Sequence, residues 1–122
     1  MSKEWRKSFS NKLLNFGVKI IKLANKLPKT PAGFAIASQL VKSGISIGAN
    51  FFEAQDASSR PDFINKMSIS LREARETAYW LDLIKLSDML NGKDLDEAII
   101  ECQEIIAILA KSVKSSKSNF KK

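Results

Sequence analysis

The sequence contains no histidine and a single cysteine, Cys102. Without histidine, no Ser-His or Cys-His nucleophile pair can form, and the Glu-x-x-His ligand pattern of di-iron bundles is excluded. A lone cysteine cannot form a disulfide within the chain, which fits a reducing compartment. No run approaches 18 apolar residues, and lysine punctuates the first residues, so neither a membrane span nor a secretion signal is predicted. We expect a cytoplasmic protein without a membrane partner.

Few residues remain as candidates for catalysis. Gly44 and Gly48 lie inside an expected helix rather than between a strand and a helix, so no phosphate-binding loop is predicted. Cys102 falls on the apolar stripe of the last expected helix, which favours an inert packing role. Glu73 and Glu76 are spaced to pair as acid and base, but the pattern supplies no nucleophile or electrophile beside them. We therefore predict no enzymatic activity, no cofactor and no metal centre.

The composition is that of a globular domain: 44% of the 122 residues are hydrophobic and 27% are charged. A chain of this length buries roughly 70% of the surface that its unfolded form exposes, so it needs no disulfide or metal for stability. We predict one domain over residues 1–113. The lysine- and serine-rich residues 114–122 are predicted to form a basic, flexible C-terminal tail.

Four segments show the apolar spacing of amphipathic helices, and none shows sustained strand alternation. The first is predicted over residues 8–27 and the second over residues 31–55, with Thr30 as its cap. The third, predicted as the longest, runs about seven turns from Pro61 to a left-handed stop at Asn91-Gly92. The fourth begins with a capping box at Asp94 and Glu97. Short connections favour antiparallel neighbours, so the predicted fold is an all-α, up-down-up-down four-helix bundle.

Charge is distributed unevenly along the chain. Residues 1–29 carry eight basic side chains and one acidic one, residues 93–110 carry one basic and five acidic, and residues 111–122 carry five basic and none acidic. Five lysines of the first helix fall within about a third of a turn. This lysine ridge comprises Lys12, Lys19, Lys22, Lys26 and Lys29. It is either an ordinary solvated face or a surface for nucleic acid or another polyanion.

No motif of a known nucleic-acid-binding fold accompanies the lysine ridge. The sequence has no RNA-recognition motif, helix-turn-helix or zinc finger, and aromatic residues are not interleaved with the lysines as stacking platforms would require. The charge pattern alone therefore supports nucleic-acid binding.

Two of the expected helices carry apolar residues on two sides. A lone bundle buries one stripe per helix, so the second set predicts a closed homo-oligomer in which another subunit covers it. The predicted interface residues are Leu14, Val18 and Ile21 on the first helix and Ile69, Trp80 and Ile84 on the third. The alternative is that a wide apolar stripe belongs to the most central helix of a single bundle.

Polar residues recur where the second and third helices would otherwise be apolar or charged. We predict a structural network that fixes helix register or subunit geometry, because buried polar groups need partners. Its predicted members are Ser46, Asn50, Glu53, Glu73, Glu76 and Tyr79. A solvated surface and a ligand or metal site at the two glutamates of the third helix are the alternatives. Gly44 and Gly48, opposite this seam, predict a close contact between helices.

Two runs of residues resemble a known family. They are Ser46-Ile47-x-Ala49-Asn50-x-x-Glu53-Ala54 and Glu73-Ala74-x-Glu76-Thr77-x-Tyr79-Trp80-Leu81. With them, most of the sequence resembles the bacterial four-helix-bundle family that is also called the 23S rRNA intervening-sequence proteins. Many relatives have proline where this chain has Gly48 and glycine where it has Ala54, so the chain is similar to a branch without those features.

The resemblance implies an antiparallel bundle that assembles into a pentameric barrel. It also implies that the motif residues Asn50, Glu53 and Glu76 have structural roles. A related group serves as the accessory protein of diversity-generating retroelements, in which a basic pentamer binds nucleic acid and a reverse transcriptase. The lysine ridge is not part of the shared motif.

Two functional hypotheses follow. The first is a non-enzymatic, oligomeric helical scaffold that binds nucleic acid, in particular structured RNA, through the lysine ridge and the C-terminal tail by sequence-tolerant electrostatic contact. The second is a protein-interaction adaptor that docks a partner enzyme such as a reverse transcriptase without touching nucleic acid. In that case the basic surface aids solubility or steering.

Overall fold

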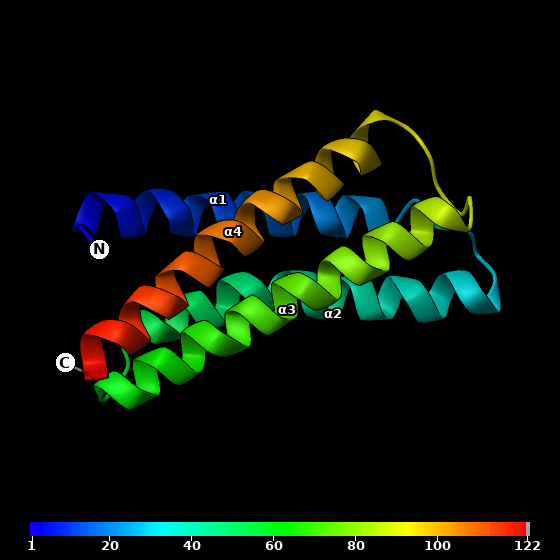
Figure 1. Cartoon of the computed structure of the whole chain (residues 1–122). Coiled ribbons are helices and arrows are strands. Elements are labelled where there is room, and N and C mark those ends of the chain that lie inside the picture. Colours follow the sequence, from blue (N-terminus) through cyan, green and yellow to red (C-terminus); the bar gives the residue numbers. More distant parts are fainter. Residues whose placement is uncertain (122) are drawn as a thin grey trace.

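Four helices make up nearly the whole chain (Figure 1). The computed structural model describes the backbone of residues 1–121 and the side chains of residues 1–119. The helices are α1 (Lys3–Ala24), α2 (Pro31–Gln55), α3 (Arg60–Leu86) and α4 (Lys93–Lys121). No strand occurs among residues 1–121. The predicted all-α class is confirmed, and the bounds predicted for the second helix are those of α2.

The helices pack in chain order, and the last returns to the first. α1 contacts α2 and α4, and α3 also contacts α2 and α4. The α1–α4 contact is the least extensive of the four, and Figure 1 shows α4 running obliquely to α1. The N- and C-terminal ends of the chain lie at the same end of the molecule. The beginnings of α1 and α3 and the ends of α2 and α4 therefore meet there.

Three helices begin at a hydroxyl side chain that caps them. Ser2, Thr30 and Ser59 have extended backbones, and each side-chain oxygen accepts a hydrogen bond from the backbone N–H three residues later, at 3.0, 3.1 and 3.2 Å. Pro31 and Pro61 lie in the first turns of α2 and α3, where no helical hydrogen bond from their nitrogen is needed. The cap predicted at Thr30 is confirmed.

Both ends of α1 differ from the prediction. The Ser2 cap lets the helix begin at Lys3 rather than Ser8, because it satisfies a backbone N–H that would otherwise be unpaired. The helix ends at Ala24 rather than Leu27. Leu27 is nevertheless buried, since its N–H bonds the Ala24 carbonyl at 3.2 Å in a tight turn that carries the apolar stripe onward.

The stop predicted for the third helix at Asn91-Gly92 is wrong. α3 ends at Leu86, and Asp88 takes the left-handed conformation with φ of 59°. The Met89 N–H then bonds the Ile84 carbonyl at 3.2 Å, which is the closure of a Schellman motif. Aspartate replaces the usual glycine in this role, so the stop carried no glycine signal. α4, with 29 residues, is longer than α3, with 27.

The ends of α4 also differ from the prediction. The carbonyl of Gly92, whose φ is 116°, accepts a hydrogen bond from the Asp96 N–H at 3.1 Å, so the helix begins at Lys93. Asp94 lies inside the first turn and does not cap it. The helix continues to Lys121, through the segment predicted as a flexible tail, and Ser116 is buried within it.

Buried hydroxyl groups connect α2 and α3 inside an otherwise apolar core. Thr77 Oγ1 on α3 lies 2.9 Å from Ser43 Oγ on α2, and Ser70 Oγ donates to the Ile47 carbonyl at 2.8 Å. All three hydroxyl side chains are fully buried. Ser43 and Thr77 also bond to carbonyls of their own helices, whereas a shift of one helix along the other would leave Ser70 unpaired in an apolar environment, so its contact favours this register. The largest fully buried apolar side chains around them are Phe16, Ile20, Leu40, Ile47, Phe51, Met67, Leu81, Ile84, Leu95, Ile105 and Leu109.

Gly44 lets α2 approach α1 closely, as predicted. A Cβ at this position would lie 2.7 Å from Cγ2 of Ile20, a fully buried and β-branched residue that has little freedom to move. A Cβ at Gly48 would be 3.5 Å from Leu13, an ordinary contact, and one at Gly17 would meet nothing within 4 Å.

We predict that Gly44→Ala lowers the free energy of unfolding. Overpacking costs about 1–3 kcal/mol, which exceeds the gain of about 1 kcal/mol from replacing glycine in a helix. Gly17→Ala is the matched control and gains the helix propensity without a clash. Urea unfolding followed by circular dichroism measures both. Equal stabilisation by the two substitutions would contradict the close contact at Ile20.

Candidate functional site

The lysine ridge lies along α4, and three of its five members form ion pairs there. Nζ of Lys19 is 2.7 Å from Glu101 Oε2, Nζ of Lys26 is 3.0 Å from Asp94 Oδ2, and Nζ of Lys12 is 3.9 Å from Glu104 Oε1. The acidic segment predicted at residues 93–110 therefore lies beside the basic segment of α1. Much of the ridge charge is balanced within the chain.

The pKa values of Lys19 and Asp94 reflect these ion pairs. The hydrogen bond that Lys19 donates to Glu101 raises the pKa of Lys19, and partial desolvation opposes this rise. The hydrogen bond and charge of Lys26 lower the pKa of Asp94. Both groups are therefore charged at neutral pH. The pair of Lys26 and Asp94 is largely exposed, so it contributes little to stability by itself.

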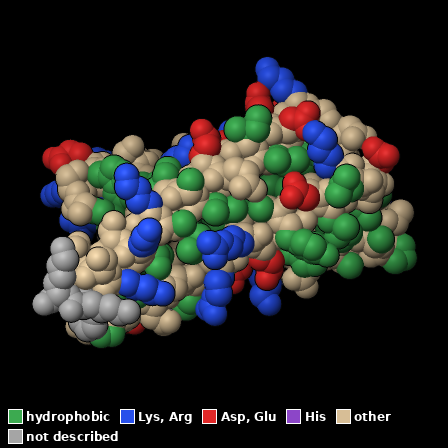
Figure 2. Space-filling view, in the orientation of Figure 1, with side chains coloured by type: hydrophobic (Ala, Val, Ile, Leu, Met, Phe, Trp, Pro, Cys, Tyr) green, Lys and Arg blue, Asp and Glu red, His purple; other side chains and the backbone are tan. Residues whose placement is uncertain are grey.

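A second group of cations lies at the end of the bundle where α1 begins and α4 ends. Among the described residues, none of its members has a carboxylate within 4.0 Å. Figure 2 shows Lys and Arg side chains gathered on the half of the visible face next to this end. We call this group the basic end. Its members are Lys3, Arg6 and Lys7 on α1, Arg60 on α3, and Lys111, Lys114 and Lys117 on α4.

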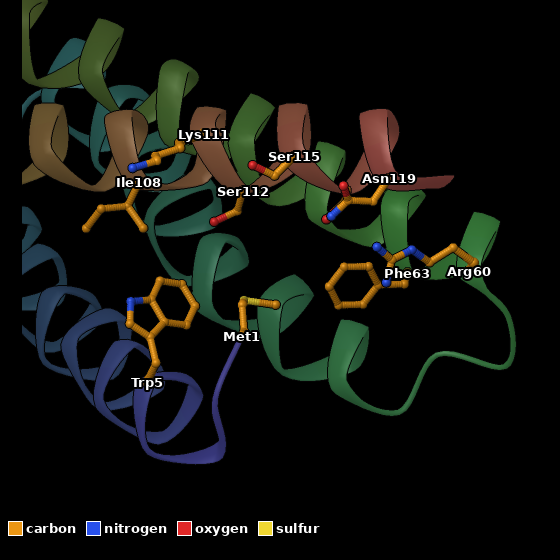
Figure 3. Close-up of a pocket in the computed structure, with 10 residues that line it drawn as sticks. Met1, Trp5, Arg60, Phe63, Ile108, Lys111, Ser112, Ser115 and Asn119 are labelled. Atoms are coloured by element: carbon orange, nitrogen blue, oxygen red, sulfur yellow. The ribbon is translucent and has the colours of Figure 1, made fainter. Parts of the chain in front are cut away.

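The basic end contains a pocket of about 480 Å³ between α1, α3 and α4 (Figure 3). Trp5 and Phe63 form aromatic walls, and Arg60 and Lys111 supply positive charge. The guanidinium carbon of Arg60 is 5.6 Å from the centre of the Phe63 ring. The remaining lining residues are Met1, Ile108, Ser112, Ser115, Ser116 and Asn119. Sequence reasoning missed this site because its residues come from three helices and have no common spacing.

An apolar groove separates the outer sides of α1 and α2. Three residues predicted for an oligomer interface line it, with exposed fractions of 69% for Leu14, 46% for Val18 and 44% for Ile21. α2 adds Ile45 at 46% and Phe52 at 65%, neither of which was predicted. The groove has a volume of about 560 Å³. The surplus apolar side of α1 is therefore exposed in the single chain.

The surplus apolar side of α3 is partly covered within the chain, so the interface prediction for this helix is wrong at Ile84. Ile84 is 1% exposed and belongs to the core. Trp80 is half-buried against the core, and Ile69 is also half-buried. α3 contacts both α2 and α4, which gives it two buried sides. For α3, the structure therefore agrees with the alternative, in which a wide apolar stripe belongs to a central helix of a single bundle.

Among the six residues of the predicted polar network, no side chain bonds to another side chain in the single chain. Ser46 Oγ donates to the Lys42 carbonyl at 2.6 Å, and Asn50 Nδ2 donates to the Ser46 carbonyl at 2.8 Å, both within α2. Tyr79 is 60% exposed. The buried connection between α2 and α3 is instead made by Ser43 and Thr77, which lie near the predicted residues on each helix.

The glutamates of this region have local partners. Glu53 pairs with Lys66 at 3.2 Å across α2 and α3, and Glu76 accepts a hydrogen bond from Trp80 Nε1 at 3.2 Å. Partial burial and the neighbouring charge of Glu76 raise the pKa of Glu73. Above the pKa that Glu73 has in the unfolded chain, its negative charge therefore lowers the free energy of unfolding. This loss of stability disappears as the pH falls and the carboxylate is protonated. Within the described residues, no three His, Cys, Asp or Glu side chains are grouped to hold a metal ion.

Cys102 is fully buried on α4, and its Sγ donates to the Ala74 carbonyl at 3.3 Å. Burial raises the pKa of the thiol to about 12. The thiol is therefore protonated at neutral pH and is a poor nucleophile.

The fold and these surfaces define a small helical-bundle protein with a basic end and an exposed apolar groove. The model of the 23S rRNA-intervening sequence protein family matches residues 5–111, and the chain belongs to this family. Within the described residues, no helix has both the length and the apolar character to cross a bilayer.

A solved structure with a similar fold is a protein of unknown function from the S23 ribosomal protein family of Bacteroides thetaiotaomicron VPI-5482. It is 38% identical to this chain, with a TM-score of 0.79, and the match covers 86% of this chain and 97% of that one. No curated protein matches the chain.

Proposed function

We propose that this protein is a non-enzymatic, oligomeric helical scaffold that binds RNA through its basic end. The observation that carries the proposal is the group of seven cations, without carboxylate partners among the described residues, on three helices at one end of the bundle. The chain has a formal net charge of +7. Because the α4 carboxylates balance much of the ridge, the excess positive charge is concentrated where a phosphate backbone can approach it.

RNA is the polyanion that best fits this surface. The family name refers to 23S rRNA, and the basic end combines cations with aromatic side chains, which duplex phosphates alone do not require. Contact is electrostatic and tolerant of sequence. The proposed setting is the cytoplasm, where the buried thiol of Cys102 stays reduced.

The apolar groove supports self-association. Leu14, Val18 and Phe52 expose a continuous apolar surface on α1 and α2, and contact with another subunit would remove this surface from water. A closed ring, a pentamer by resemblance to the family, would bring several basic ends into one assembly. Each added contact with the same RNA would then increase the overall affinity through effective concentration.

We predict that neutralising the basic end weakens RNA binding more than neutralising the ridge. Lys111→Gln, Lys114→Gln and Lys117→Gln together should reduce the slope of log K against log salt by about 2–3, at 0.7–0.9 per lost phosphate contact. Lys12→Gln, Lys19→Gln and Lys26→Gln together give the same net charge and should leave the slope nearly unchanged. Fluorescence anisotropy with a labelled RNA hairpin, measured from 50 to 300 mM salt, gives both slopes.

The reverse pattern, with binding lost only in the ridge variant, would contradict the proposed site. Full binding by both variants would also refute the basic end as the RNA site. Absence of RNA binding by the parent protein would favour the adaptor hypothesis, in which a partner enzyme rather than RNA is the ligand. Pull-down from lysate with and without nuclease then separates the two, because a protein partner remains after nuclease treatment.

We predict that the native protein has a mass several times the 13.6 kDa of one chain. Leu14→Asp with Phe52→Asp places two charges in the apolar groove and should shift the mass to that of one chain while preserving helicity. Leu86→Asp with Ile100→Asp is the matched control, because these side chains are also largely exposed, at 84% and 63%, but lie outside the groove. Light scattering measures the mass. A folded wild-type monomer would refute self-association through the groove.

A further inference from the structure

The pocket at the basic end has a rigid aromatic wall. The Trp5 ring stacks on Phe9, with ring centres 5.1 Å apart and an angle of 24° between the planes, and meets the edge of Phe51 at 6.4 Å. Phe9 and Phe51 are buried core residues. The indole is therefore supported from the core side, while Figure 3 shows it facing the residues of α4 across the pocket. A planar ligand that enters the pocket can stack without first ordering this wall.

The opposite side of the pocket carries a cation beside an aromatic ring. Arg60 lies over the Phe63 ring, and Lys111 lines the pocket from α4. Figure 3 shows that Ser112, Ser115 and Asn119 come from successive turns of α4 along the same side. The pocket thus offers flat apolar walls, positive charge and short polar side chains within a volume of about 480 Å³, which is in the range of small-molecule sites.

A neighbouring hollow adds an unpaired hydrogen-bond acceptor. This hollow, of about 380 Å³, shares Met1, Arg60 and Phe63 with the pocket and is also lined by Gln55. Gln55 Oε1 is buried and has no hydrogen-bond partner among the described residues, while its Nε2 donates to the Phe51 carbonyl at 2.9 Å. A buried acceptor of this kind needs a donor.

We propose that this pocket binds one unpaired nucleotide of the RNA, with its base between Trp5 and Phe63 and with the two phosphates that flank it at Arg60 and at Lys111, which lie at opposite ends of the pocket. The proposal rests on RNA binding by the basic end and adds that single-stranded segments, such as loops or ends, are preferred over duplex. A base inside a duplex is already stacked and paired, so it cannot enter the pocket without being flipped out. Stacking of this kind tolerates different bases because each has a planar face.

Met1 is the one lining side chain that stands between the two aromatic walls, as Figure 3 shows. It is 57% exposed, and its unbranched side chain has several rotatable bonds. A nucleotide can displace it toward solvent without a change in the helices. The core packing of Trp5 is not disturbed by this movement.

Fluorescence of Trp5 tests the proposal directly. In a Trp80→Phe background, Trp5 is the only indole, because the chain has two tryptophans. An unpaired RNA heptamer should quench its emission on binding, whereas a duplex of the same length and inorganic phosphate should not. The heptamer should also bind more tightly than the duplex.

A pocket-filling substitution supplies the matched control. Ser115→Leu fills the pocket without changing charge, and it should lower affinity for the heptamer about tenfold, as expected for the loss of one stacked base. Ser118→Leu, on an exposed site of the same helix outside the pocket, should bind like the parent. The proposal is supported if the heptamer quenches Trp5 emission in the parent protein and in Ser118→Leu but not in Ser115→Leu.

Two outcomes would overturn it, and they differ in what else they remove. If heptamer and duplex both bind without quenching Trp5, or if both leucine variants bind equally, the nucleotide pocket is refuted while RNA binding by the basic end stands. If neither RNA binds, the proposed function itself fails, and this inference fails with it.

Discussion

The ion pairs between α1 and α4 determine where this protein has free positive charge. Lys12, Lys19 and Lys26 have carboxylate partners on α4, so much of the charge of the lysine ridge is balanced within the chain. The pairs also bridge the least extensive helix contact of the bundle. All three lie along the contact between α1 and α4. Seven of the cations that have no carboxylate within 4.0 Å among the described residues lie at the end where α1 begins and α4 ends.

α1 is the helix on which the proposed functions meet, because each of its sides has a different neighbour. Its core stripe, including Phe16 and Ile20, packs inside the bundle. Its lysine ridge faces α4, and Leu14 and Val18 form the wall of an open groove with α2. Its first turns bring Trp5 to the basic end. The proposed subunit contact and the proposed RNA contact therefore lie on separate parts of α1 and do not compete for surface.

The sequence was sufficient to predict the class, the helix count and the bounds of α2, because proline, hydroxyl caps and apolar periodicity agree there. It failed where the signal was unusual. Asp88 occupies the left-handed stop that normally carries glycine, and Ser2 extends α1 beyond its apolar stripe. Ile84 was assigned to the surface because periodicity cannot distinguish a helix with two buried sides from one that faces another subunit. The pocket could not be predicted, since Trp5, Phe63 and Lys111 meet only after three helices have packed. The interface and the polar network remain predictions of the assembled state.

The most direct test of the charge distribution is lysine footprinting. The full-length protein is acetylated briefly with and without a saturating structured RNA, and the modification of each lysine is measured by mass spectrometry. The account predicts that RNA protects Lys111, Lys114 and Lys117 together with Lys3 and Lys7, while the modification of Lys12, Lys19 and Lys26 is unchanged. Protection confined to the three ridge lysines would contradict it.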